Sequence, residues 1–244
     1  MLNLNKKTVF FAIGLCATQL SFADIFINAT RVIYQSDKRE VTFTVNNSGK
    51  KTSLIQSWVD EGNAKETPDN TTAPFILTPP ISIIPAEKAQ NIRMRFTADK
   101  KMAEDRETLF WINVLEVPQN TEAENQLRIA LRTRIKMFFR PAQLAIKPED
   151  VHSKINWKLT HKDGKWVAIA QNNSPYYVTF ASINIKTPQF SGKAQLLPQT
   201  SMIAPTETLQ FSMEPSKENQ EDEVKFSIIN DYGGTSEYSA RVNN

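Results

Sequence analysis

The sequence predicts an all-β protein, and three observations support this prediction. Apolar and polar residues alternate with a period of two, which is typical of strands with one buried face. Clusters of turn-forming residues, such as Asn46 to Gly49, separate the alternating runs. Sustained helical periodicity is absent, although residues 100–107 could form a single turn or a short helix. The alternating runs cover residues 41–45, 54–58, 92–96, 127–131, 155–159 and 224–228.

The length of 244 residues allows one large domain or two domains of about 100 residues each. The best internal boundary follows Arg140, because an apolar run ends at Pro141 and a polar segment around Pro148 precedes the next alternating run. We therefore expect an N-terminal domain at 24–140 and a C-terminal domain at 141–244. Each has the size of an immunoglobulin-like β-sandwich.

The first 23 residues resemble a cleavable secretory signal. Lys6 and Lys7 precede an apolar run, and Ser21-Phe22-Ala23 supplies small residues at a cleavage site. The run is shorter than the roughly 18 to 20 apolar residues of a membrane span, and no later segment approaches that length. We expect a soluble exported protein that is not embedded in a membrane. Because Cys16 is the only cysteine, the mature chain would have no disulfide and would depend on core burial.

The charge balance argues against general nucleic-acid binding. Without Lys6 and Lys7 the chain keeps 27 of its 29 cations against 26 acids, a net charge of +1. Phosphate binding usually needs a strong basic excess.

No residue pattern indicates catalysis, a metal site or a cofactor. His152 and His161 are nine residues apart without a cysteine, which is not a zinc-ligand spacing. The chain has only seven glycines, no glycine-rich phosphate loop and no GxSxG motif. A hydrolase site assembled from distant strands remains as an alternative, which a metal-content assay and a substrate screen would test.

One stretch, NQLRIALRTRIKMFFRP at 125–141, combines an apolar run with five cations. Its apolar residues Leu127, Ile129 and Leu131 share one side of a strand. Alternation alone favours a half-buried strand that faces its own sheet, with solvated charges. The cations are Arg128, Arg132, Arg134, Lys136 and Arg140.

The segment MAEDRETLFWINVLEVP, at 102–118, resembles the signature of the PapD-like periplasmic pilus (fimbrial) assembly chaperones. Further pieces fall in the family's order: ATRVIY, VTFTVNN, SLIQSWVD, PFILTPPISIIPAEKAQNIRMRF, the 125–141 stretch and INDYGG. The resemblance implies two immunoglobulin-like β-sandwich domains in a boomerang arrangement. It also implies a non-enzymatic periplasmic carrier without a cofactor, which binds incomplete pilin subunits and delivers them to an outer-membrane usher.

The resemblance also implies roles for particular residues. A donor strand at 125–140 would insert Leu127, Ile129 and Leu131 into the open groove of a subunit. Arg31 and Lys136 would hold the subunit's C-terminal carboxylate, a role that suits a bidentate guanidinium and a compact ammonium. Three further residues, Glu107, Arg140 and Asp231, would form a charge network between the domains. Arg128, Arg132 and Arg134 keep their interpretation as solvated charges.

Three local features accompany these assignments. Leu131 and Lys136 are five residues apart, so strict alternation puts them on opposite faces, and a bulge, a strong twist or contact from the strand's edge would reconcile them. Thr78-Pro79 is the candidate for a cis peptide bond. The short loop at 119–125 resembles the short-loop branch of the family.

A pilus subunit or adhesin is a second alternative, since it would also be exported and immunoglobulin-like. Such subunits usually carry a cysteine pair and a penultimate tyrosine, whereas Asn243 stands at that position here. An exposed strand edge would also permit self-association of the free chaperone.

Overall fold

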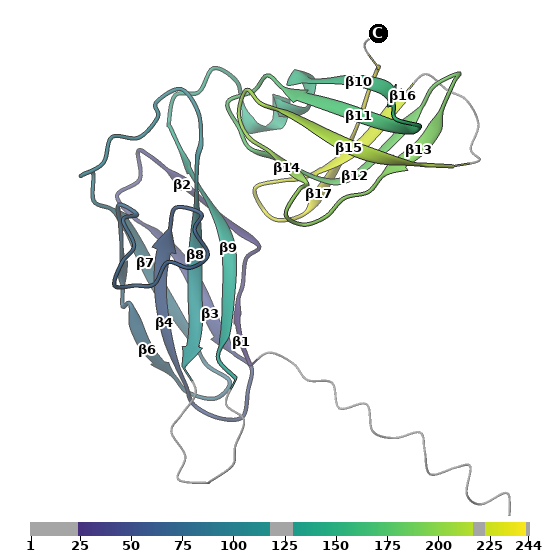
Figure 1. Cartoon of the computed structure of the whole chain (residues 1–244). Helices are drawn as coiled ribbons and strands as arrows, with labels where there is room; N and C mark the ends of the chain where they lie inside the picture. Colours follow the sequence, from purple (N-terminus) through teal and green to yellow (C-terminus); the bar gives the residue numbers. More distant parts are fainter. Residues whose placement is uncertain (1–23, 118–128, 217–222, 243–244) are drawn as a thin grey trace, which may run out of the picture.

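The structure is a computed structural model that describes residues 24–117, 129–216 and 223–242. The described residues form two groups of strands set at an angle to each other (Figure 1). The prediction of an all-β protein is confirmed. The suggested helix at 100–107 is wrong, because this segment has no helical turn. A 3-10 helix forms instead at η1, Pro148–Lys154, where proline occupies the first turn and acidic side chains follow it.

The N-terminal sandwich has two sheets. One sheet has the order β1-β3-β7-β5, and the other has the order β2-β9-β8-β4-β6. All neighbours are antiparallel except β2 and β9, which run parallel. The strands are β1 (Ile25–Ile27), β2 (Arg31–Gln35), β3 (Val41–Asn47), β4 (Ser53–Asp60), β5 (Phe75–Thr78), β6 (Ile81–Ile84), β7 (Ala89–Phe96), β8 (Thr108–Val117) and β9 (Leu131–Arg140).

The core between these sheets contains the buried residues of the alternating runs. Val45, Ile55, Ile92 and Ile112 are fully buried, and Tyr34 stacks on Phe139 within an aromatic group. Burial of each large apolar side chain contributes about 1.5–3 kcal/mol, which compensates for the absence of disulfides. The Thr78–Pro79 peptide bond is cis.

The C-terminal sandwich follows η1. Its strands follow the order β10-β11-β15-β13-β12-β16-β17, with β14 paired to β12, and its core surrounds the fully buried Trp157. The strands are β10 (Ile155–Lys162), β11 (Lys165–Asn172), β12 (Val178–Lys186), β13 (Ser191–Ala194), β14 (Met202–Ile203), β15 (Thr208–Pro215), β16 (Glu223–Ile229) and β17 (Thr235–Ala240).

Strand β9 is the element that positions the candidate site. Its register with β8 runs without a shift from Leu131 to Phe139, so the bulge suggested from the sequence is absent there. Ile135, Met137 and Phe139 face the core, and Leu131 has the same parity. Lys136 therefore lies on the opposite face of the sheet.

One edge of β9 is covered only in part. Strand β2 pairs with β9 from Lys136 to Arg140. From Leu131 to Ile135, no described strand pairs with this edge, so its backbone N–H and C=O groups remain open to a further strand.

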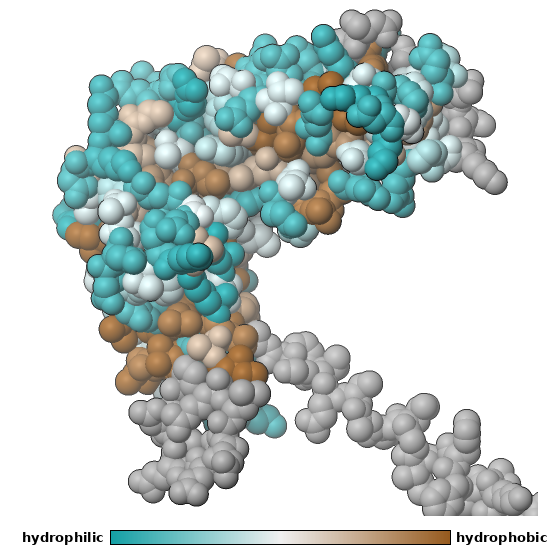
Figure 2. Space-filling model, viewed as in Figure 1, coloured by the Kyte–Doolittle hydropathy of each residue, from teal (hydrophilic) through white to brown (hydrophobic). Residues whose placement is uncertain are grey.

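Apolar side chains gather at the end of the N-terminal sandwich that lies farther from the other domain (Figure 2). Ile81 and Ile83 on β6 are exposed there, and the register places Leu54 of β4 and Val117 of β8 beside them on the outer face of the sheet. Within the residues that the structure describes, no helix has the length and hydropathy needed to cross a membrane.

Candidate functional site

Arg31 and Lys136 lie directly opposite each other on the parallel strands β2 and β9. Arg31 is only 9% exposed; its Nη1 donates a hydrogen bond to the carbonyl of Ile229 at 2.9 Å. Its Nε is buried without a partner. Lys136 pairs with no carboxylate among the described residues, and its Nζ lies 5.8 Å from the centre of the Trp111 ring.

Burial disfavours the protonated state of both cations, and the charge of Arg31 adds to this effect at Lys136. Burial lowers the pKa of Lys136, and the charge of Arg31 lowers it further. Burial also lowers the pKa of Arg31, although Asp231 and Glu107 partly offset this effect. A bound anion would offset the repulsion between Arg31 and Lys136 and would accept a hydrogen bond from the unpaired Nε of Arg31. The pair is therefore suited to a carboxylate.

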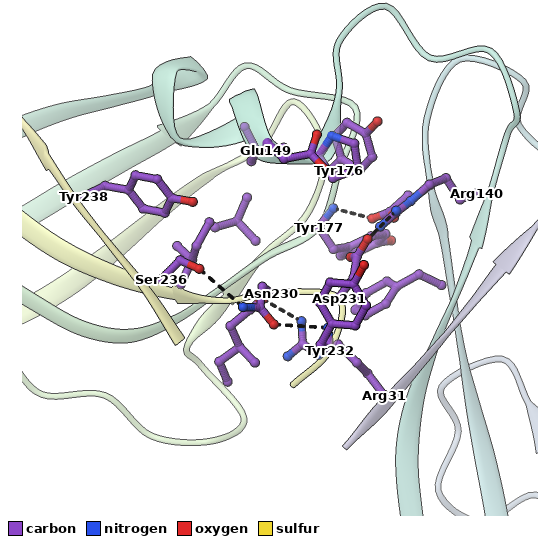
Figure 3. A pocket seen from close by; sticks show the side chains of 17 residues that line it. Arg31, Arg140, Glu149, Tyr176, Tyr177, Asn230, Asp231, Tyr232, Ser236 and Tyr238 are labelled. Carbon is purple, nitrogen blue, oxygen red and sulfur yellow. Dashed lines mark hydrogen bonds and ion pairs between the residues drawn. The ribbon is translucent and has the colours of Figure 1, made fainter. Parts of the chain in front are cut away.

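A second charged group joins the two domains. Arg140 donates from Nε to Glu107 at 2.7 Å, and from its two Nη atoms to the carboxylate of Asp231 at 2.6 and 2.8 Å. The other oxygen of Glu107 accepts the backbone N–H of Tyr177 at 2.8 Å. The Arg140 guanidinium also lies 4.9 Å from the centre of the Tyr176 ring. Figure 3 shows these side chains converging from both domains.

Burial and ion pairing act in opposite directions in this group. Burial raises the pKa of Glu107, and the nearby Arg140 guanidinium counteracts part of that rise. Burial alone would lower the pKa of Arg140, but the bonds to Asp231 and Glu107 raise it above its ordinary value. A paired guanidinium thus stays charged inside the interface.

Hydrogen bonds from within the turn and a glycine hold the turn that carries Asp231. The side-chain oxygen of Asn230 accepts the N–H groups of Tyr232 and Gly234, both at 3.1 Å. Gly233 has φ +84°, and a Cβ at this position would meet the hydroxyl of Thr30 at 2.4 Å. Glycine therefore allows the left-handed turn and its close approach to the first domain.

A cavity of about 230 Å³ lies between the domains beside these groups (Figure 3). Arg31, Arg140 and Asp231 line it together with aromatic side chains from the C-terminal domain. Arg31 and the charge network thus border one cleft, and Lys136 is the strand neighbour of Arg31 outside the cavity lining.

The start of β9 and the residues just before it carry apolar side chains that face solvent. Ile129 is 66% exposed and Leu131 is 48% exposed. Leu127, the third residue of the expected set, lies outside the described residues, as does the loop at 119–125.

Two family descriptions match the chain in succession. Residues 24–145 match "Pili and flagellar-assembly chaperone, PapD N-terminal domain", and residues 150–240 match "Pili assembly chaperone PapD, C-terminal domain". The chain belongs to the PapD-like pilus-assembly chaperones.

Individual relatives agree with this assignment. The probable fimbrial chaperone YadV of Escherichia coli K12 is 40% identical over 233 residues, which cover 91% of each chain. The chaperone protein HifB of Haemophilus influenzae is 32% identical, with 96% of each chain covered.

Solved structures of chaperones also resemble this one. The YadV chaperone structure has a TM-score of 0.74 at 35% identity, covering 90% of this chain and all of that chain. A Salmonella enterica structure of the SafA pilin in complex with the SafB chaperone has a TM-score of 0.73 at 25% identity. That match covers 91% of this chain and 98% of the other.

In this chaperone the sequence interpretation of two arginines is wrong. Arg132 and Arg134 were expected to be solvated, but both bind the fully buried carboxylate of Asp60. Asn113 donates a further hydrogen bond to Asp60 at 2.7 Å. Burial alone would raise the pKa of Asp60, whereas the bonds from Arg134 and Asn113 lower it below its ordinary value.

Each arginine of this group also stacks on a tryptophan. The Arg132 guanidinium lies 4.7 Å from the Trp58 ring centre, and that of Arg134 lies 4.2 Å from the Trp111 ring centre. These residues come from three strands, so spacing within one segment could not reveal the group. The available signal was the aromatic-x-polar pattern shared by Trp58-Val59-Asp60 and Trp111-Ile112-Asn113.

The histidines of this chaperone have structural contacts. The His152 ring stacks on Tyr238 at 4.1 Å between centres, and His161 packs against Trp166 at 5.0 Å. In the described ranges, no three His, Cys, Asp or Glu side chains are grouped to hold a metal ion.

Proposed function

We propose that this chaperone captures pilin subunits by adding β9 to their incomplete fold, with Arg31 and Lys136 anchoring the subunit's C-terminal carboxylate. The observation that supports this function best is the free edge of β9. This edge begins at the exposed Leu131, two residues after the exposed Ile129, and leads to Lys136, which has no carboxylate partner among the described residues. Strand addition to an open sheet edge is a general recognition mode, of which chaperone–pilin complexes are an example.

The opposite faces of Leu131 and Lys136 are compatible with this mode. A strand that pairs with the edge of β9 meets both faces of the sheet at once. Ile129 and Leu131, and Leu127 by the same parity, would enter the subunit's core from one face. A terminal carboxylate beside Lys136 would then be reached from the edge, without a bulge.

Burial of these side chains would supply much of the affinity. Each contributes about 1.5–3 kcal/mol when it leaves water, before the cost of ordering is subtracted. The backbone hydrogen bonds of the added strand would satisfy the open N–H and C=O groups between Leu131 and Ile135.

The charge network of Glu107, Arg140 and Asp231 would hold the domains 24–140 and 141–244 at the angle that the cleft requires. Burying such charges is costly, so geometric specificity is the better explanation than net stabilisation. The donor strand at 125–140 would then enter the subunit in a fixed orientation toward the cleft.

Delivery to an outer-membrane usher needs a surface that stays free while β9 is occupied. The exposed apolar residues Ile81 and Ile83 meet this condition, because β6 is at the opposite edge of the sheet from the open side of β9. An exposed apolar patch of this kind is typical of a protein-interaction site. We place the working protein in the periplasm after removal of residues 1–23, as a carrier without enzymatic activity. The free edge of β9 would also permit self-association before a subunit arrives.

A periplasmic pull-down with the tagged chaperone tests the function. We expect a pilin subunit in the eluate, identified by mass spectrometry, and its loss when Lys136→Ala replaces the wild type. Lys158→Ala, at an exposed lysine on β10, serves as the matched control and should retain the subunit. An eluate without any pilin from the wild-type chain would contradict the function.

A further inference from the structure

Strand addition along β9 has a register ambiguity that apolar alternation cannot remove. A slip of one residue turns every side chain to the wrong face, but a slip of two residues restores the same faces. A subunit strand displaced by two residues would therefore still fit its apolar side chains against Ile129 and Leu131.

The cations of β9 repeat at this same interval. Arg132, Arg134 and Lys136 share one face of the strand, at steps of about 6.6–6.8 Å. If all three were free, a terminal carboxylate could pair at Lys136 in the correct register, or at Arg134 or Arg132 after a slip.

Two of these three cations are already occupied. Arg134 Nε donates to Asp60 Oδ2 at 3.1 Å, and its Nη2 bonds the other carboxylate oxygen. Arg132 Nη2 lies 3.5 Å from Asp60 Oδ2, and its Nε donates to Asn113 Oδ1 at 2.8 Å. The carboxylate of Asp60 is wholly buried, so solvent competes little for these bonds.

Lys136 is kept apart from this group. The register places Asp60, Trp111 and Lys136 in one row across β4, β8 and β9, with Trp111 in the middle. The ring of Trp111 is closer to Arg134 than to Lys136, at 4.2 Å against 5.8 Å. Among the described residues, no carboxylate pairs with the Lys136 ammonium, which faces Arg31 across the strand pair.

We propose that Asp60 is a positioning residue that sets the register of subunit capture. It neutralises and immobilises Arg132 and Arg134, so β9 offers a terminal carboxylate a single unpaired ammonium, that of Lys136. This inference rests on the proposed function, because it concerns how the same edge selects one alignment of the subunit strand.

The test compares two forms of the pilin that co-purifies with the wild-type chaperone: the full-length subunit and a subunit lacking its last two residues. In the correct alignment the shortened subunit would end beside Arg134. Wild-type chaperone should bind it about tenfold more weakly or worse, because that cation is already paired. Asp60→Asn should bring the two affinities to within about threefold of each other, as Arg134 becomes available.

Asp60→Glu is the conservative control and should keep the wild-type preference for the full-length subunit. A purely structural role for Asp60 would weaken the binding of both subunits equally and leave their ratio unchanged. If Asp60→Asn still rejects the shortened subunit as strongly as wild type does, the register inference is overturned.

Arg134→Gln keeps the proposal testable if Asp60→Asn does not fold. It should leave full-length capture unchanged, because Arg134 is already paired. A loss equal to that of Lys136→Ala would make Arg134 a carboxylate ligand and overturn the inference. The proposed function fails separately, if Lys136→Ala captures the full-length subunit as well as the wild type does.

Discussion

Arg31 and Lys136 are direct neighbours across the parallel pair β2 and β9, although 105 positions separate them in the sequence. Both cations are partly or largely buried, and neither has a carboxylate bound to it among the described residues. Their juxtaposition concentrates positive charge at the end of the open edge of β9. An anion that binds beside the two cations would therefore stabilise their charged forms.

Replacing Lys136 with alanine should abolish subunit capture and leave the fold intact, because its ammonium makes no ion pair within the described chain. Arg31→Ala should also abolish capture, but it removes the bond to Ile229 as well and should loosen the contact between domains. Pull-down of the pilin together with circular dichroism checks both effects. Wild-type recovery of pilin by Lys136→Ala would refute the anchor.

Charge placed on the free edge should block capture without unfolding the chaperone. Leu131→Asp and Ile129→Asp alter exposed side chains, so their melting temperatures should stay near that of the wild type. Met137→Ala, at a fully buried position of the same strand, should instead cost about 2–5 kcal/mol of unfolding free energy. Urea unfolding and pilin pull-down separate the two classes of variant. Unimpaired pilin binding by Leu131→Asp would argue against insertion of this residue.

Removing Arg140 should be among the most destabilising changes at the domain interface. Arg140→Ala leaves the buried carboxylate of Glu107 without its ion-pair partner, at a cost of about 3–5 kcal/mol. Arg106→Ala breaks only the exposed pair with Asp105 and should have almost no effect on stability. Urea unfolding gives the difference, and small-angle scattering reports the angle between domains. Equal stability of the two variants would contradict the role given to the network.

Gly233→Ala should disturb the contact between the domains. Its φ of +84° strains any L side chain by about 1–2 kcal/mol, and the added Cβ would also collide with Thr30. Gly164→Ala is the matched control, since Gly164 has φ +75° but no atom within 4 Å of such a Cβ. Both variants should lose some stability, and only Gly233→Ala should change scattering and pilin capture. Identical behaviour of the two would show that the contact with Thr30 is unimportant.

Asp60 should make the stability of the chaperone sensitive to acid. Its pKa is lower in the folded chain than the ordinary value of about 3.9, so its contribution is complete above that value. The contribution disappears as the pH falls through the lowered folded pKa. The stability difference between wild type and Asp60→Asn should therefore be largest at neutral pH and shrink in acid. Urea titrations at several pH values measure it, and a constant difference would exclude this linkage.

Much of this chaperone is predictable from local sequence. Period-two alternation identifies strands because a strand buries every second side chain, and the runs at 41–45, 92–96 and 224–228 all lie in strands. The 102–118 signature and the INDYGG turn pointed to the family that the matches over residues 24–145 and 150–240 show. The same alternation placed Leu131 and Lys136 on opposite faces, as the unshifted register of β9 confirms.

Tertiary structure alone revealed the charged group around Asp60. Arg132 and Arg134 looked like solvated residues of one strand, yet they bind a buried carboxylate from β4. Their partner, Asp60, is more than 70 residues away in the sequence. Ion pairing depends on the distance between charges in space. Only the register of β4, β8 and β9 brings these three residues close together. The sequence by itself thus determined the class of this protein and which residues of β9 share a face. The packing of β4, β8 and β9 decided that Lys136, among the described cations on its face of β9, has no carboxylate partner.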